Sequence, residues 1–313
     1  MTGKQRVNIG TRGSALALWQ ANWVKSELER EYPGIEVSIT VIKTKGDKIL
    51  DVPLAKVGGK GLFVKEIEDA LLAHDIDLAI HSMKDVPTEL PDGLQVAIIP
   101  PREDPRDAFF SHTGKSLQEM PAGAVIGTSS LRRKSQLLHA FPHLTTKDLR
   151  GNVDTRLKKL ARGEYDGIIL AYAGVKRLGW ADQVTELIDP IISLPAIAQG
   201  ALGIETRIND DFNNQRLAFF HDQKTALAVR AERALLKTLE GGCQVPIAAY
   251  ATVDENNRIS LTGLVAALDG RKIIKETASG QEPESLGNGL AHTLLQQGAA
   301  ELLKECFDAN PEN

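Results

Sequence analysis

The sequence predicts an α/β protein built from two similar domains in tandem, and three observations support this. The segments VNIGTRGSAL (residues 7–16) and VIGTSSL (residues 125–131) share Ile-Gly-Thr followed by a serine and a leucine. Each segment leads from a short apolar run into an amphipathic pattern, which is typical of a strand, a turn and a helix N-terminus. Continuous apolar runs alternate with helical patterns along the chain, which indicates largely parallel sheets covered on both faces.

Each of these two segments is followed by a second related unit. The stretches DIDLAIHSMKDVP (residues 75–87) and EYDGIILAYAGVKRLG (residues 164–179) both combine an acidic residue, a buried type of strand, and then small and basic residues. The paired order of these units predicts an internal duplication.

Composition limits the function classes. With 313 residues, 42% hydrophobic and 25% charged, the chain can bury a sizeable core and divide into two or three domains. No stretch is typical of a signal peptide or of a membrane helix, so we expect a cytoplasmic protein with no membrane partner. The histidines and cysteines show no zinc spacing, and KVGGKGLF (residues 56–63) departs from the nucleotide-binding loops. We therefore expect no metal and no nucleotide.

The two cysteines stand in different settings. Cys306 lies in an apolar pattern of helical spacing, which predicts a small buried side chain. Cys243 lies in LEGGCQVPIAAY (residues 239–250), where a glycine pair and a proline predict a shaped loop. The loop by itself leaves open whether this thiol is reactive or incidental to a tight turn.

Basic residues gather around the duplicated turns although the formal net charge of the chain is −4. Helix N-termini and arginine side chains both bind carboxylates and phosphates. Helix capping would account for the hydroxyl side chains but not for the arginines. The few aromatic residues and the acidic balance argue against nucleic acid. We therefore expect a small polyanion in a cleft between the two domains, bound by groups that include Arg12, Ser14, Thr128, Ser129, Ser130, Arg132, Arg133, Arg150, Arg156, Lys176 and Arg177.

Asp85 is the catalytic candidate. It follows a predicted buried strand in HSMKDVP, beside Lys84 and shortly before Pro87. An aspartate at such a position is often only a turn former. Among many arginines, however, a single carboxylate stays ionised, so it could stabilise a cation that forms on a substrate and could also transfer protons.

Several motifs together resemble one family. They are GTRGSALALWQA, KVGGKGLFVKE, DLAIHSMKDVP, REDPRDAF, IGTSSLRRKSQL, LRGNVDTRL, ISLPAIAQGALGIE and LEGGCQVPI. The set is similar to the motifs of the porphobilinogen deaminase (hydroxymethylbilane synthase) family, in the family's order and over nearly the whole chain. The resemblance implies a transferase of tetrapyrrole (haem) biosynthesis. Such an enzyme joins four porphobilinogen molecules head to tail and releases hydroxymethylbilane and four ammonia.

The resemblance also implies a role for each matching residue. Cys243 would carry a covalent dipyrromethane cofactor through a thioether, and Asp85 would stabilise the electron-poor pyrrole that forms when ammonia leaves. The implied cofactor-binding residues are Ser82, Lys84, Thr128, Ser129, Ser130, Arg132, Arg133, Arg150, Gly151 and Asn152. The implied substrate-binding residues are Arg12, Ser14, Gln20, Lys60, Phe63, Arg156, Arg177 and Gln199.

The family fold would have three domains, and the chain would be a monomer. Domains 1 (residues 1–100 and 200–218) and 2 (residues 105–194) would resemble type II periplasmic binding proteins. Domain 3 (residues 222–313) would be a smaller α+β domain that carries Cys243. The sequence departs from the family pattern at Ala198, where we expect a glycine. This departure puts the backbone geometry before Gln199 in question.

Two alternatives from other classes share some of these features. A non-catalytic anion-binding protein of the periplasmic type would have the duplicated architecture, but it would need an export signal and would not need Cys243. A cysteine hydrolase that uses Cys243 with His81 would form an acyl-enzyme and carry no pyrrole.

Overall fold

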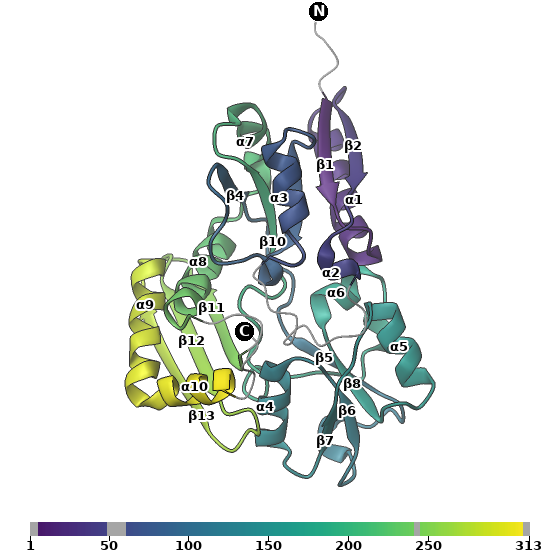
Figure 1. Cartoon of the computed structure of the whole chain (residues 1–313), viewed down its shortest axis with the longest axis vertical. Helices are drawn as coiled ribbons and strands as arrows, with labels where there is room; N and C mark the ends of the chain where they lie inside the picture. The colour runs from purple at the N-terminus through teal and green to yellow at the C-terminus, as the bar shows by residue number, and fades with distance from the viewer. Residues whose placement is uncertain (1–5, 49–60, 241–244, 309–313) are drawn as a thin grey trace, which may run out of the picture. The chain divides into compact units, whose positions relative to one another are not determined.

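The first of three sheets belongs to the N-terminal part of the chain. The computed structural model describes residues 6–48, 61–240 and 245–308. The strands lie in the order β2-β1-β3-β10-β4 (Figure 1). Strand β1 is parallel to β2 and β3, whereas β10 is antiparallel to β3 and β4. Their bounds are β1 Arg6–Thr11, β2 Glu36–Val41, β3 Leu78–Ser82, β4 Leu94–Ile98 and β10 Leu202–Arg207.

Helices cover both faces of this sheet, as the apolar runs predicted. Helix α1 (Ala15–Glu31) buries Val24 and Leu28 in a core that also contains Ile80 of β3. On the other face, α3 (Lys65–Leu72) buries Ile67 and Leu71. The remaining elements are α2 (Lys45–Lys48), the 3-10 turn η2 (Met83–Asp85), α7 (Asp211–Leu217) and η5 (Ala218–Phe220).

The second sheet follows the same plan, with the strand order β7-β6-β8-β5-β9. Its strands are β5 Asp107–Ser111, β6 Val125–Gly127, β7 Thr145–Lys147, β8 Gly167–Ala171 and β9 Glu186–Leu187. Helix α4 (Leu131–Ala140) packs Leu137 into one core of this sheet, and α5 (Val153–Ala161) and α6 (Tyr172–Arg177) contribute Leu160 and Val175 to the other. Short turns η3 (Leu117–Glu119) and η4 (Ala181–Gln183) complete this part.

The two sheets are topological equivalents. In each, the strand that precedes the duplicated turn is second in the sheet and pairs in parallel with both neighbours, and the fourth strand runs antiparallel to the third. The fourth strands, β10 and β5, each follow a segment by which the chain passes between the two sheets. The predicted α/β architecture is therefore confirmed: two topologically equivalent α/β sheets precede a smaller α+β part.

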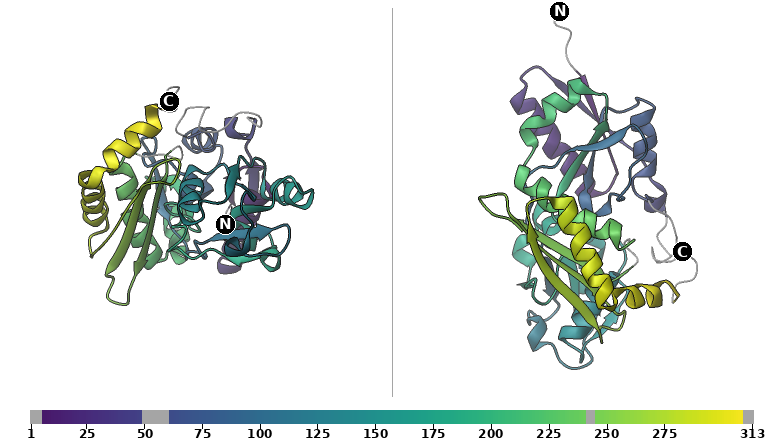
Figure 2. Two further views of the ribbon diagram at one scale, coloured as in Figure 1. Left: turned by 90° about the horizontal axis from the view of Figure 1, so that it is seen from below. Right: turned by 90° about the vertical axis from the view of Figure 1, so that its left-hand side faces the viewer.

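The C-terminal part contains an antiparallel sheet in the order β11-β12-β13, with α8, α9 and α10 beside it (Figures 1 and 2). Gly263 of β12 and Gly287 of α9 allow close packing, because a Cβ at either position would meet atoms of α8 at 2.6 Å and 2.4 Å. The bounds are α8 Gln223–Thr238, β11 Ile247–Val253, β12 Ile259–Ala266, β13 Ile273–Gly280, α9 Pro283–Leu294, the π turn η6 Leu295–Ala299 and α10 Ala300–Asp308. Cys306 is buried in α10, as its helical pattern predicted.

The described residues form two compact units. The first comprises described residues up to Lys48, those from Gly61 to Arg102 and those from Ala201 to Ala226. The second contains both the β5–β9 sheet and the C-terminal sheet, so the proposed three-domain division stays a prediction. None of the described helices combines the length and the apolar character of a membrane span.

Candidate functional site

In the first unit, the carboxyl ends of β1 and β3 carry several of the predicted residues. Ser14 is the N-cap of α1, and its Oγ accepts a hydrogen bond of 3.3 Å from the Ala17 N–H. The side-chain amide of Gln20, a residue only 2% exposed, donates to Ser82 Oγ at 3.0 Å. These contacts stabilise the strand ends and thereby fix the backbone that leads to Lys84 and Asp85.

Asp85 is exposed at the end of η2, directly after the buried strand β3. Among the residues that the structure describes, its carboxylate forms no hydrogen bond and no ion pair. A charged group that the fold does not use internally is available to a ligand. This placement agrees with the predicted catalytic role without testing it.

Arg12 has an acidic partner that the sequence analysis did not identify. Its Nε donates to Asp47 at 3.1 Å, its Nη2 also donates to Asp47, and its guanidinium lies 4.2 Å from the ring centroid of Phe63. Arg12 and Phe63 are thus brought together as predicted substrate-binding residues. The sequence did not indicate Asp47 as a partner of Arg12. Asp47 lies in α2, a helix of only four residues, which is too short to show a helical pattern.

A buried titratable cluster lies between β3, β10 and α3. His81 Nε2 is 2.8 Å from Glu205 Oε2, and both side chains are almost completely buried. Burial and the nearby Glu205 carboxylate raise the pKa of Glu68 to about 7. His81 therefore has an internal carboxylate partner, and the cysteine hydrolase that pairs it with Cys243 is not favoured.

The second copy of the turn leads into α4, where the first helical turn offers backbone N–H groups to an anion. Ser130 is the N-cap, and its hydroxyl makes no capping bond to the helix. Thr128 Oγ1 accepts from the Ser130 N–H at 3.2 Å, and Ser129 Oγ donates to the Leu149 carbonyl at 3.0 Å. Thr128 and Ser129 therefore shape the turn, while the hydroxyl of Ser130 remains available at its tip.

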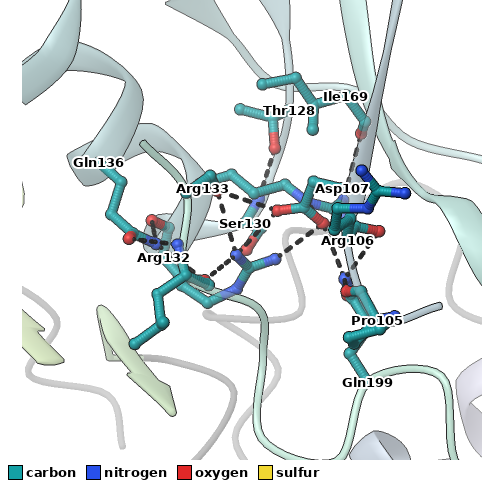
Figure 3. Close-up of polar contacts among 12 residues, drawn as sticks. Pro105, Arg106, Asp107, Thr128, Ser130, Arg132, Arg133, Gln136, Ile169 and Gln199 are labelled. Atoms are coloured by element: carbon teal, nitrogen blue, oxygen red, sulfur yellow. Dashed lines mark hydrogen bonds and ion pairs between the residues drawn. The ribbon is translucent and has the colours of Figure 1, made fainter. Parts of the chain in front are cut away.

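Arg132 and Arg133 converge on Asp107, a fully buried aspartate at the start of β5 (Figure 3). Arg132 Nη1 donates to Asp107 at 2.8 Å, and Arg133 donates to it through Nε and Nη2 at 3.0 and 2.8 Å. Burial alone would raise the pKa of Asp107, but the two guanidinium groups hold it well below its usual range. Both arginines thus carry a structural role beside their predicted cofactor-binding role.

Gln199 belongs to the same buried network (Figure 3). Its side-chain amide donates to the Pro105 carbonyl at 2.6 Å and to Asp107 Oδ1 at 2.9 Å. The preceding residue, Ala198, has a positive φ of 57°, a conformation that glycine adopts more easily. The chain therefore keeps the backbone geometry expected of the family's glycine, and the Ala198 N–H donates to buried Glu232 at 2.5 Å.

The loop before α5 carries a second group of predicted residues. Gly151 has a φ of 111°, and Asn152 is the N-cap of α5 without a side-chain capping bond. Arg156 Nε donates to the Gly151 carbonyl at 2.7 Å. Burial, together with the positive charges of Arg133 and Arg150, lowers the pKa of Arg156 to about 10. Arg156 still carries its charge at neutral pH, and no described carboxylate forms an ion pair with it.

Arg177 at the end of α6 is similar to Arg156. Its Nη2 donates to the Gly200 carbonyl at 2.8 Å, and burial lowers its pKa to about 10. Its neighbour Lys176 instead pairs with Glu103 at 2.9 Å.

Two predicted residues, Lys60 and Cys243, lie outside the described residues. Described residues on either side of the Cys243 segment are buried: Leu239 is 3% exposed and Val245 is 4% exposed. The predicted cleft depends on how the two units sit relative to one another, and it stays a prediction.

Comparisons with known proteins place the chain in a family. A model described as "Porphobilinogen deaminase, dipyromethane cofactor binding domain" matches residues 7–215, and one described as "Porphobilinogen deaminase, C-terminal domain" matches residues 226–296. This chain belongs to the porphobilinogen deaminase family. Porphobilinogen deaminase from Geobacter sulfurreducens is 57% identical, with 96% of this chain and 95% of that protein covered. The enzyme from Brevibacillus brevis is 52% identical, with 97% and 98% covered.

Among solved structures, the periplasmic aliphatic sulphonate binding protein SsuA from Escherichia coli aligns with a TM-score of 0.39 and 14% identity, covering 75% of this chain and 71% of that one. The family is one of transferases, the hydroxymethylbilane synthases, and its cofactor is dipyrromethane. The second unit fits such a group. A dipyrromethane carries carboxylates, and the positive charges around Arg156 repel one another until an anion binds.

The Asp107 network predicts a large effect on stability. We expect Asp107→Asn to lower the free energy of unfolding by about 3–5 kcal/mol, because it leaves two buried guanidinium groups without their carboxylate. Urea unfolding monitored by circular dichroism measures this. Asp104→Asn is the control, since Asp104 pairs with Arg106 closer to the surface and should cost at most about 1 kcal/mol. Equal effects of the two substitutions would contradict the structural role of Asp107.

Glu68 predicts a pH dependence of stability. Its pKa of about 7 in the folded protein exceeds the ordinary value of 4.5, so the native state binds a proton that the unfolded state has released across this window. Its contribution to stability therefore falls as the pH rises from about 4.5 to about 7. We expect Glu68→Gln to be more stable, relative to the unmodified protein, at pH 8 than at pH 5. Exposed Asp69 provides the control: Asp69→Asn should leave the difference between the two pH values unchanged.

Proposed function

We propose that Asp85 and Cys243 carry the chemistry of this porphobilinogen deaminase and that its arginines hold the carboxylates of the pyrroles. The single observation that best supports this proposal is the state of Asp85, an exposed carboxylate at the end of a buried strand that has no partner among the residues the structure describes. A carboxylate that the fold does not require for stability is typical of a functional group.

Asp85 would act on the aminomethyl pyrrole of the substrate. When ammonia leaves, positive charge develops on the pyrrole, and a carboxylate fixed next to the pyrrole N–H stabilises that charge. The same carboxylate can accept a proton and return it later in the cycle. The buried strand β3 and the bond between Gln20 and Ser82 hold the backbone on which Asp85 lies.

The basic residues of the second unit would bind acetate and propionate groups. Within the described ranges of the chain, Arg156 and Arg177 donate to main-chain carbonyl oxygens and form no ion pair with a carboxylate, so their charge would be available to a bound carboxylate. The Ser130 hydroxyl and the N-terminus of α4 add hydrogen-bond donors. Arg12 would bind a substrate carboxylate in the first unit, since its guanidinium is partly exposed.

Cys243 would hold the dipyrromethane through a thioether. When bound, this cofactor supplies the free pyrrole carbon to which substrate units are joined. The chain's contribution that the structure describes lies beside the attachment point: Leu239 and Val245 are buried, and Glu232 accepts hydrogen bonds from the N–H groups of Ala251 of β11 and of Ala198. A tethered acceptor makes each addition effectively intramolecular, which raises its rate.

We also infer that the protein is a cytoplasmic monomer with porphobilinogen as its small-molecule partner and with no nucleic-acid partner. Members of this family act on a biosynthetic intermediate, and the chain has an acidic net charge of −4. Size-exclusion chromatography with light scattering tests the oligomeric state.

Replacement of Asp85 tests its catalytic role. We expect Asp85→Asn to reduce porphobilinogen consumption by about 100-fold or more, because it removes the negative charge that stabilises the developing cation. Circular dichroism should remain unchanged, since the side chain is exposed. Asp92→Asn removes another exposed carboxylate of the same unit and should retain activity. Near-normal turnover by Asp85→Asn would remove Asp85 from the mechanism.

Intact-protein mass spectrometry tests the attachment point. We expect the protein to be heavier than its sequence by two pyrrole units, and Cys243→Ser to show the bare sequence mass and no turnover. Cys306→Ala should keep both the adduct and the activity, because Cys306 is 3% exposed and burial raises its pKa to about 11. An adduct that maps to Cys306 would contradict attachment of the cofactor at Cys243.

A further inference from the structure

The guanidinium of Arg12 is held on two sides within the first unit. Its Nε and Nη2 donate to the Asp47 carboxylate, while its Cζ lies over the ring of Phe63, 4.2 Å from the ring centroid. Within the part of the chain that the structure describes, Arg12 Nη1 has no hydrogen-bond acceptor. One edge of the guanidinium is therefore used internally, and the other edge is available.

Asp47 is itself fixed from the opposite side. Its Oδ2 accepts a hydrogen bond from the hydroxyl of Thr44 at 2.8 Å and from the Thr44 N–H at 3.3 Å. Thr44 is fully buried, so this anchor belongs to the core of the unit. Burial alone would raise the pKa of Asp47, but the bonds from Arg12 and Thr44 lower it, so the carboxylate stays charged at neutral pH.

The packing of Phe63 depends on Gly46, the residue before Asp47. A Cβ at Gly46 would lie 2.3 Å from the Phe63 ring, a distance that no side chain can occupy without displacing the ring. The Lys45 N–H also donates to Glu66 of α3 at 3.0 Å. The short helix α2 and the start of α3 are thus fitted to each other around Arg12.

We propose that Asp47 is a positioning residue for substrate binding: it holds Arg12 by one edge so that the Nη1 edge faces a carboxylate of porphobilinogen. This inference rests on the proposed role of Arg12 in substrate binding. Arginine has a long side chain with high rotamer entropy, and a guanidinium that is already immobilised loses less entropy when it binds a carboxylate. Preorganisation of this kind contributes to affinity without direct contact between Asp47 and the substrate.

Asp47 could also have the opposite effect on substrate affinity, and the test has to distinguish the two effects. A negative charge near a carboxylate-binding arginine could compete with the substrate, in which case its removal would lower KM. In the structure, however, Asp47 binds the Nε edge, so a carboxylate at the Nη1 edge would have the guanidinium between it and Asp47. This arrangement weakens the repulsion and leaves the orienting effect dominant. The sign of the change in KM therefore distinguishes the two roles.

The experiment is a double-mutant cycle on the cofactor-loaded enzyme, with KM and kcat for porphobilinogen measured for Arg12→Ala, Asp47→Ala and the double variant. We expect Arg12→Ala to raise KM about 30-fold and Asp47→Ala about 10-fold, with kcat changed less than about 3-fold. The double variant should resemble Arg12→Ala alone, because Asp47 acts through Arg12. Asp47→Asn, which keeps an oxygen acceptor, should raise KM less than Asp47→Ala does.

Controls separate the possible failures. Glu284 accepts bonds from Arg230 Nε and Nη2 at 2.7 and 2.8 Å, so Glu284→Ala removes a matched ion pair and should leave KM unchanged. A normal KM for Arg12→Ala would contradict the proposed role of Arg12 itself. A raised KM for Arg12→Ala with an unchanged or lowered KM for Asp47→Ala would overturn the positioning role alone. Additive effects in the double variant would overturn it as well, since Asp47 would then act independently of Arg12.

Discussion

The buried carboxylate of Asp107 joins more parts of the second unit than any other single interaction described above. It lies at the first residue of β5 and accepts hydrogen bonds from Arg132 and Arg133 in the first turn of α4. It also accepts from Ser193 at 3.0 Å and Gln199 at 2.9 Å, in the segment that leads to β10. Because burying an ion is costly, every acceptor site of the carboxylate has to be used, and strand, helix and connecting segment are thereby fixed together.

From Gln199 the polar contacts continue into the C-terminal part. The next residue back, Ala198, donates its N–H to Glu232 of α8, and the other oxygen of Glu232 accepts from the Ala251 N–H of β11 at 2.8 Å. Two buried carboxylates, Asp107 and Glu232, thus bracket the Ala198–Gln199 turn. Ala198 has a positive φ, and in this conformation its N–H is satisfied by the Glu232 carboxylate. Hydrogen bonds to buried carboxylates therefore hold this turn on both sides, although it contains no regular secondary structure.

The sequence predicted what depends on local pattern. The strand–turn–helix units, their duplication and the burial of Cys306 follow from apolar periodicity, and all three were confirmed. The acidic partners Asp47, Asp107 and Glu232 were not predicted, because their roles depend on contacts between residues 34 to 35 positions apart, or 25 in the case of Arg132. A weak signal did exist for Asp107, since an acidic residue directly before the apolar run AFF needs a buried partner.

The predicted ligand-binding arginines, which the sequence analysis treated as equivalent, fall into two groups that differ in their hydrogen-bond partners. Arg132 and Arg133 neutralise an internal carboxylate, so most of their interaction energy goes to the fold. Among the described residues, Arg156 and Arg177 donate only to main-chain carbonyl oxygens, and burial lowers the pKa of both to about 10. A partly buried cation without a carboxylate destabilises the free protein and is relieved when an anion binds. In the described part of the chain, Arg156 and Arg177 therefore hold charge that a bound anion would neutralise, whereas Arg132 and Arg133 are already paired with Asp107.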